Sequence, residues 1–265
     1  MTLIVSLRIP DGIVIAGDSL STTMSQLQIE SQVNVTCPEC GHQHTVGPMP
    51  VGPIQVPSST FSYAQKVFKF LDNYGVGTFG QGLLLGRTMH FAMRDLEQEL
   101  RNSNNIPENV SAVADAIGQR ALEMVQEQVT DLDNAPDDWY AVGFQVVGYD
   151  DDDVRSIVLH VGNGVRTQVY DDLGCTYSGQ GHVVAAIWEL YNQRPDDQAQ
   201  YPLFSLQDAI EYAEFLIRTT AVYQQFSQTI PQVGGDIDVA LVTPFDGFRW
   251  IKQKPLAKLL EGQGA

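Results

Sequence analysis

The second residue of the chain, Thr2, is a candidate nucleophile. A threonine at a free chain start is self-contained, because its own α-amino group, with an ordinary pKa of about 7.7 to 8.0, can take the hydroxyl proton. Such a site also needs a cation that keeps the amine neutral, a carboxylate that holds the cation, and backbone N–H groups that receive an oxyanion. The chemistry would be acyl transfer through an ester on Thr2.

Met1 decides whether this chemistry is available. While Met1 is attached, Thr2 has no free amine and the mechanism stops. A small residue after the initiator normally permits aminopeptidase trimming, so we expect Met1 to be removed. The alternative is that Thr2 is merely the first residue of a strand.

The segment TCPECGHQH is a candidate metal site. Cys37 and Cys40 have C-x-x-C spacing, and Gly41 supplies the flexible backbone of a tight knuckle. His42 and His44, two residues apart, face the same side of an extended chain. Four N/S ligands favour a closed structural zinc site. A single-ion tetrahedron within so short a segment would be strained, so a neighbouring subunit is a possible source of ligands; the alternative is a reduced, metal-free loop.

A third motif, GVGTFG, places Gly75, Gly77 and Gly80 at G-x-G-x-x-G spacing. A dinucleotide site also needs a helix that starts within the motif and a crossover to a parallel strand. Helical periodicity begins only near Gly86. A nucleotide-binding module is therefore the weakest alternative.

Periodicity and turn residues predict the elements that position these groups. Pro10-Asp11-Gly12 is a turn signature between two strands, and Ser205 is a candidate N-cap, a residue typical of a helix start. The predicted strands cover residues 2–6, 13–16, 66–70, 75–79, 140–149, 156–161, 237–243 and 248–251, and the predicted helices cover residues 86–100, 109–129, 182–191 and 206–223.

Strands in pairs separated by helices in pairs argue against an alternating βαβ sheet. They predict an α+β fold, a four-layer αββα sandwich of two stacked antiparallel sheets with helices outside. We expect residues 1–265 to form a single domain. Gln, Ser, Gly and five prolines predict a largely irregular insertion at about 24–63, which carries the Cys/His segment.

The charge composition of the chain limits the classes of partner that it is expected to bind. With 15 basic and 32 acidic residues, the formal charge is -17, which repels phosphate backbones and anionic membrane surfaces. We therefore expect no nucleic-acid or membrane partner. The apolar run 3–7 is too short for a signal sequence or a membrane span. These features predict a cytoplasmic protein with reduced thiols, in which Cys175 is an ordinary buried cysteine.

Four segments together resemble a known family. TLIVSLRIPDGIVIAGDSLST resembles the start of a proteasome β-subunit and of its bacterial relatives, the HslV-type and Anbu peptidases. AQKVFKFLDNYGVGTFGQG, SGQGHVVAAIWELY and GGDIDVALVTPFDGF are similar to later segments of the family, in the same order. The resemblance implies the N-terminal-nucleophile (Ntn) hydrolase fold.

The resemblance also implies roles for individual residues. It places the nucleophile and its amine on Thr2, the carboxylate on Asp18 and the lysine on Lys66. It places the oxyanion N–H on Gly80 and a contact with the substrate main chain on Thr22. It implies a threonine peptidase or amidase that acts on peptides or unfolded proteins and assembles as a homo-oligomeric ring or helix. The resemblance does not decide whether an ATPase is a partner of the chain.

The chain departs from the family at three positions. Gln180 stands in Gly179-Gln180-Gly181 where the family commonly has Gly-Ser-Gly, and Ile230 and Val233 stand where it has an Asp and a Ser. The auxiliary hydroxyl and carboxylate network is therefore missing. Either a minimal Thr-Asp-Lys site suffices, as in the Anbu-like branch, or the chain is a non-catalytic ring or scaffold subunit.

Overall fold

The computed structural model describes residues 2–130, 132, 134–151, 153–227 and 230–254, without the side chains of residues 24–35 and 43–57. Met1 lies outside the described residues. The chain divides into two compact units. The first combines Met1–Ser21 with Phe61–Ala265, and the second is Thr22–Thr60.

The first unit is α+β, with two five-stranded antiparallel sheets and four α-helices among its described residues, and this arrangement is compatible with a sandwich. The first sheet has the order β12-β1-β2-β13-β14, and the second has the order β11-β10-β9-β6-β5. The strands of the first sheet are β1 (Leu3–Ile9), β2 (Gly12–Asp18), β12 (Gly174–Gly179), β13 (Ile237–Thr243) and β14 (Gly247–Lys252). Those of the second are β5 (Val67–Phe70), β6 (Tyr74–Gly80), β9 (Val142–Asp150), β10 (Asp153–Val161) and β11 (Val165–Tyr170).

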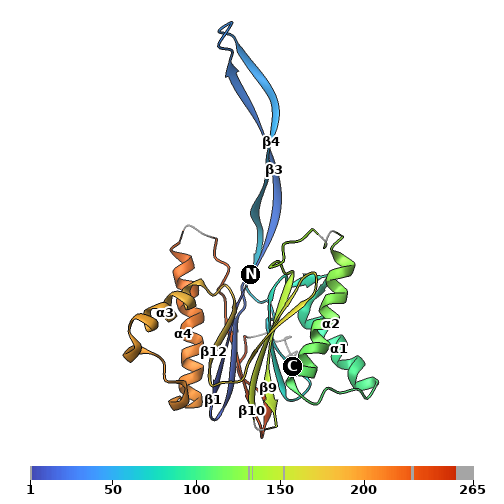
Figure 1. Ribbon diagram of the computed structural model, residues 1–265, viewed down its shortest axis with the longest axis vertical. Helices are drawn as coiled ribbons and strands as arrows, with labels where there is room; N and C mark the ends of the chain where they lie inside the picture. Colours follow the sequence, from blue (N-terminus) through green and yellow to red (C-terminus); the bar gives the residue numbers. More distant parts are fainter. Residues whose placement is uncertain (1, 131, 133, 152, 228–229, 255–265) are drawn as a thin grey trace, which may run out of the picture. The chain divides into compact units, whose positions relative to one another are not determined.

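Each sheet packs against its own pair of helices. One apolar cluster joins the second sheet to α1 (Met89–Asn102) and α2 (Val110–Gln128), and another joins the first sheet to α3 (His182–Gln193) and α4 (Leu206–Gln225). Figure 1 shows α3 and α4 beside β1 and β12, and α1 and α2 beside β9 and β10. A third cluster takes side chains from both sheets, including Ile4, Ile15 and Val147.

The glycine motif belongs to this contact between the sheets. Gly75 and Gly77 lie within β6, which pairs antiparallel with β5 and β9, and the next α-helix begins only at Met89. A Cβ on Gly77 would lie 2.5 Å from Ile4 Cγ2, so glycine lets β6 approach β1 closely. The strand-to-helix turn of a dinucleotide site is therefore not formed at this motif, which argues against the nucleotide-binding alternative.

The predicted strands and helices of the first unit are confirmed, with ends shifted by a few residues. The helix at Ser205 begins with a capping box that includes Asp208. β11 and β12 were not predicted from the sequence. β11 is mostly exposed and mixes its valines with Arg, Thr and Gln. β12 begins and ends with glycine. Neither strand therefore shows the clear apolar alternation that marks a half-buried strand. Shorter elements are β7 (Leu83–Leu84), β8 (Arg87–Thr88) and the 3-10 turns Pro195–Asp197 and Tyr201–Leu203.

The second unit differs from the irregular insertion expected at about 24–63. β3 (Ser21–Thr36) and β4 (Gln43–Phe61) pair as a two-stranded ribbon, drawn in Figure 1. The prolines of β4 misled the prediction. Each strand of a two-stranded ribbon has a free edge, where a proline without an N–H is tolerated.

Candidate active site

Strand pairing brings the chain start to Asp18. Ile4 of β1 lies opposite Gly17 of β2, so Leu3 and Asp18 meet at the same end of the first sheet. The N–H of Leu3 donates to Asp18 Oδ1 at 3.0 Å. Thr2, which is 4% exposed, is thus held one residue away from the carboxylate.

Lys66 forms a buried ion pair with this carboxylate. Its Nζ lies 2.9 Å from Asp18 Oδ1, and the exposed fractions of the two side chains are 6% and 0%. The ammonium also donates to the carbonyl oxygen of Leu20. Asp18 Oδ2 accepts the N–H groups of Leu20 at 3.2 Å and Gly234 at 3.0 Å. Four donors around one carboxylate favour its ionised form.

Burial and pairing act in opposite directions on this pair. Burial raises the pKa of Asp18 and lowers the pKa of Lys66, whereas each charge stabilises the other. The ammonium of Lys254 lowers the pKa of Lys66 further. The ion pair therefore lies in a low-dielectric setting, where a lysine charge acts strongly on a neighbouring amine.

The carbonyl group of Thr2 is fixed by the end of β12. Its oxygen accepts the N–H of Gln180 at 2.7 Å. Gly179 has a φ of +89°, and a Cβ there would lie 2.0 Å from the same oxygen. Only glycine fits at this close approach.

Gly80 ends β6 in the same region. The N–H of Thr78 donates to the carbonyl oxygen of Lys66 at 2.8 Å. A Cβ on Gly179 would lie 3.5 Å from the Cβ of Phe79, which precedes Gly80. The ends of β2, β6 and β12 and the start of β1 thus bring the regions of Thr2, Asp18, Lys66 and Gly80 together. Gly80 has a φ of +85°.

Other residues singled out from the sequence do not take part in these contacts. Thr22 belongs to the second unit, and its role stays a prediction. Val233 is buried in the apolar cluster beneath α4, and its N–H donates to Gln224 Oε1 at 3.0 Å.

Two residues that hold the site were missed. Gly234 donates to Asp18, and its carbonyl oxygen accepts the N–H groups of Ser19 at 3.1 Å and Leu20 at 2.8 Å. Ser19 Oγ donates to the carbonyl oxygen of Ser62 at 2.7 Å, which ties the end of β2 to the segment before Lys66. The Gly-Gly pair before β13 was the only signal.

A second buried Asp–Lys pair was also missed. Asp238 lies in β13 opposite Gly17. Its carboxylate accepts the main-chain N–H of Lys254 at 2.7 Å and also pairs with the Lys254 ammonium. The exposed fractions of the two side chains are 1% and 0%.

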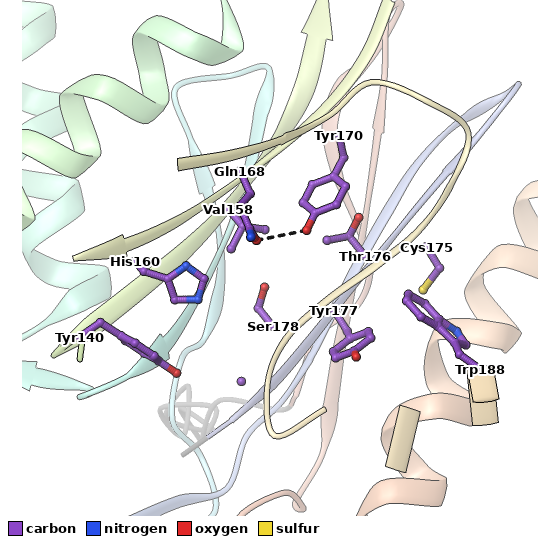
Figure 2. A pocket seen from close by; sticks show the side chains of 11 residues that line it. Tyr140, Val158, His160, Gln168, Tyr170, Cys175, Thr176, Tyr177, Ser178 and Trp188 are labelled. Atoms are coloured by element: carbon purple, nitrogen blue, oxygen red, sulfur yellow. Dashed lines mark hydrogen bonds between the residues drawn. The ribbon is translucent and has the colours of Figure 1, made fainter. Parts of the chain in front are cut away.

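A cavity of about 340 Å³ adjoins Gly179 (Figure 2). Its walls come from β10 and β11 on one side and from β12 and α3 on the other. Within the described part of the chain, Ser178 Oγ and Trp188 Nε1 are buried without a hydrogen-bond partner. The lining residues are polar or aromatic for the most part: Tyr140, Val158, His160, Gln168, Tyr170, Cys175, Thr176, Tyr177, Ser178, Gly179 and Trp188.

The turn between β3 and β4 forms a knuckle in the second unit. The N–H of Gly41 donates to the Cys37 carbonyl oxygen, and the N–H of Cys37 donates to that of His42, both at 2.9 Å. The Cys37 sulfur accepts the N–H groups of Cys40 and Glu39, which lower its pKa. The side chain of His44 lies outside the described residues.

No protein-family model matches the chain, and no curated protein matches it. Among the described residues, no helix has both the length and the apolar character needed to cross a membrane.

Proposed function

We propose that this chain is an N-terminal threonine hydrolase with the four-layer αββα arrangement of Ntn hydrolases, and that it cleaves amide bonds in peptides or unfolded proteins. One observation carries the proposal. The carboxylate of the buried Asp18–Lys66 pair accepts the N–H of Leu3, the residue that follows Thr2.

Thr2 performs the chemistry after Met1 has been removed. Its α-amine takes the Oγ1 proton while Oγ1 attacks the substrate carbonyl carbon. The amine then gives that proton to the leaving amine, and an ester to Thr2 remains. Water, deprotonated by the same amine, hydrolyses the ester. Lys66 keeps the amine unprotonated by like-charge repulsion, and Asp18 holds Lys66 in place.

The surrounding glycines position the reacting groups. Gly179 and the N–H of Gln180 fix the Thr2 carbonyl group, which sets the direction of the chain start. Gly80 supplies the oxyanion N–H. The cavity beside Gly179 accommodates a polar or aromatic substrate side chain, because hydroxyl, imidazole and amide groups line it together with aromatic rings.

The partners follow from the same proposal. The chain assembles as a homo-oligomeric ring or helix in the cytoplasm. Its formal charge of -17 disfavours nucleic acid and anionic membranes.

A non-catalytic ring or scaffold subunit is the second candidate. Val233 and Ile230 stand where the resembling family has a hydroxyl and a carboxylate, and Val233 is packed in an apolar cluster, 1% exposed. A scaffold needs the fold but not the auxiliary network.

Intact-protein mass spectrometry distinguishes these candidates. Natively expressed protein is weighed before and after treatment with a peptide epoxyketone or a β-lactone. We expect loss of Met1 and one adduct per chain, retained in Thr2→Ser and absent in Thr2→Ala. Full retention of Met1, or no adduct on a confirmed Thr2 terminus, would overturn the hydrolase and favour the scaffold.

A further inference from the structure

The turn between β3 and β4 presents two thiols at the closed end of a ribbon. β3 contains 16 residues, which at about 3.3 Å per residue extend over roughly 50 Å. Cys37 is half-buried and Cys40 is exposed. An isolated two-stranded ribbon is marginally stable in water, so a clip at its turn would have a structural purpose.

The backbone of the turn is arranged for thiolates. The Cys37 sulfur accepts two main-chain N–H groups, from Cys40 and Glu39, and lies within hydrogen-bond reach of the Cys40 thiol. Gly41 adopts a φ of +68°, which returns the chain toward β4. Main-chain N–H groups that point at a sulfur stabilise its negative charge and orient it as a metal ligand.

One turn provides half of a tetrahedral zinc site. Structural zinc takes four N or S ligands. No third His, Cys, Asp or Glu is grouped with the two cysteines among the side chains that the structure describes. His42 Nδ1 lies 3.0 Å from the carbonyl oxygen of Cys40, so only its Nε2 could face a metal, and the His42 variant below tests that nitrogen.

We propose that Cys37 and Cys40 of one chain, together with the same two residues of a second copy, bind one zinc ion through four thiolates. Four thiol protons pass to the solvent as four Zn–S bonds form, so zinc binding weakens as the pH falls. The ion offsets two of the four negative charges that the thiolates carry in the site. The site links two ribbons and does not involve Thr2.

Metal stoichiometry is the first test. The full-length chain is purified with a reductant and zinc, and its metal content is measured by elemental analysis. We expect one zinc ion for every two chains. Native mass spectrometry of a mixture of isotopically heavy and light chains should show mixed species that form only with zinc, beyond those of the proposed ring or helix, and that disappear when a chelator is added.

Matched variants locate the ligands. Cys37→Ser and Cys40→Ser should each lose the zinc and the zinc-dependent pairs, whereas Cys175→Ser should keep both. His42→Ala and His44→Ala should also keep the zinc. Cobalt substitution adds a spectroscopic measurement, because the visible bands of a four-thiolate site differ from those of a mixed sulfur and nitrogen site.

Three outcomes would overturn the proposal. One zinc ion per chain that is lost on His42→Ala or His44→Ala would place the whole site within one chain. A reduced, fully folded protein without zinc would remove the site. Zinc-bound chains that never exchange into mixed pairs would remove the second copy as the source of ligands.

Discussion

The two buried Asp–Lys pairs differ in the hydrogen-bond donors that surround their carboxylates. Both Asp18–Lys66 and Asp238–Lys254 are almost inaccessible to solvent. Asp238 accepts from the main chain and the ammonium of one residue, Lys254. Asp18 accepts from Lys66 and from three main-chain N–H groups in separate places, those of Leu3, Leu20 and Gly234.

Burial and charge therefore do not by themselves mark a candidate catalytic pair. Both pairs meet the same electrostatic demand, since a buried carboxylate needs a cation and hydrogen bonds. What distinguishes Asp18–Lys66 is its connection to the residue after Thr2. Variants that separate stability from reactivity test this distinction.

Removal of each lysine should have the largest effect. Lys66→Met and Lys254→Met each leave a buried carboxylate unpaired, so each should lower the free energy of unfolding by about 3–5 kcal/mol. Lys66→Met alone should also slow adduct formation on Thr2, by roughly 10²–10⁴-fold. Denaturant unfolding and the rate of electrophile addition measure the two effects. Equal rates in the two folded variants would contradict the assignment.

A methyl group at Gly179 should have the next largest effect. In Gly179→Ala, the positive φ costs about 1–2 kcal/mol, and the overlap with the Thr2 oxygen adds about 1–3 kcal/mol. Gly82→Ala is the matched control, because a Cβ there meets nothing within 4 Å. Thermal unfolding measures both. If the two variants were equally stable, the close contact between Gly179 and Thr2 would be disproved.

The smallest effect should come from Cys175. Its thiol lies near the Arg8 guanidinium but does not form an ion pair with it. Burial raises the pKa of Cys175 to about 12 despite the nearby Arg8. The folded state then keeps a proton that the unfolded thiol loses above pH 9.0, so stability falls as the pH rises from there toward about 12. The loss is at most about 1.4 kcal/mol per pH unit.

Cys175→Ala should remove this part of the alkaline decline. Denaturant unfolding at several pH values compares the slope of the variant with that of the unmodified chain. Identical slopes above pH 9.0 would show that the thiol titrates alike in both states.

The local sequence pattern was sufficient to predict much of the fold. The turn at Pro10-Asp11-Gly12 and the N-cap at Ser205 are formed by neighbouring residues, so both could be predicted from the sequence. The ribbon of β3 and β4 could not, because the pairing partner decides whether a proline-rich strand is tolerated. β11 is mostly exposed and has no clear apolar alternation, so it could not be predicted from the sequence either.

For the candidate site, the sequence by itself supplied the residue types: a threonine at position 2, an acid at the end of a strand, and a lysine before another strand. The pairing of Asp18 with Lys66 in a buried setting is visible only in the folded structure. The same is true of the hydrogen bonds from Gly234 to Asp18 and from Gln180 to the Thr2 carbonyl oxygen. The physical reason is distance along the chain. Hydrogen bonds that span 48 and 216 residues depend on how the sheets pack and leave no periodic signal.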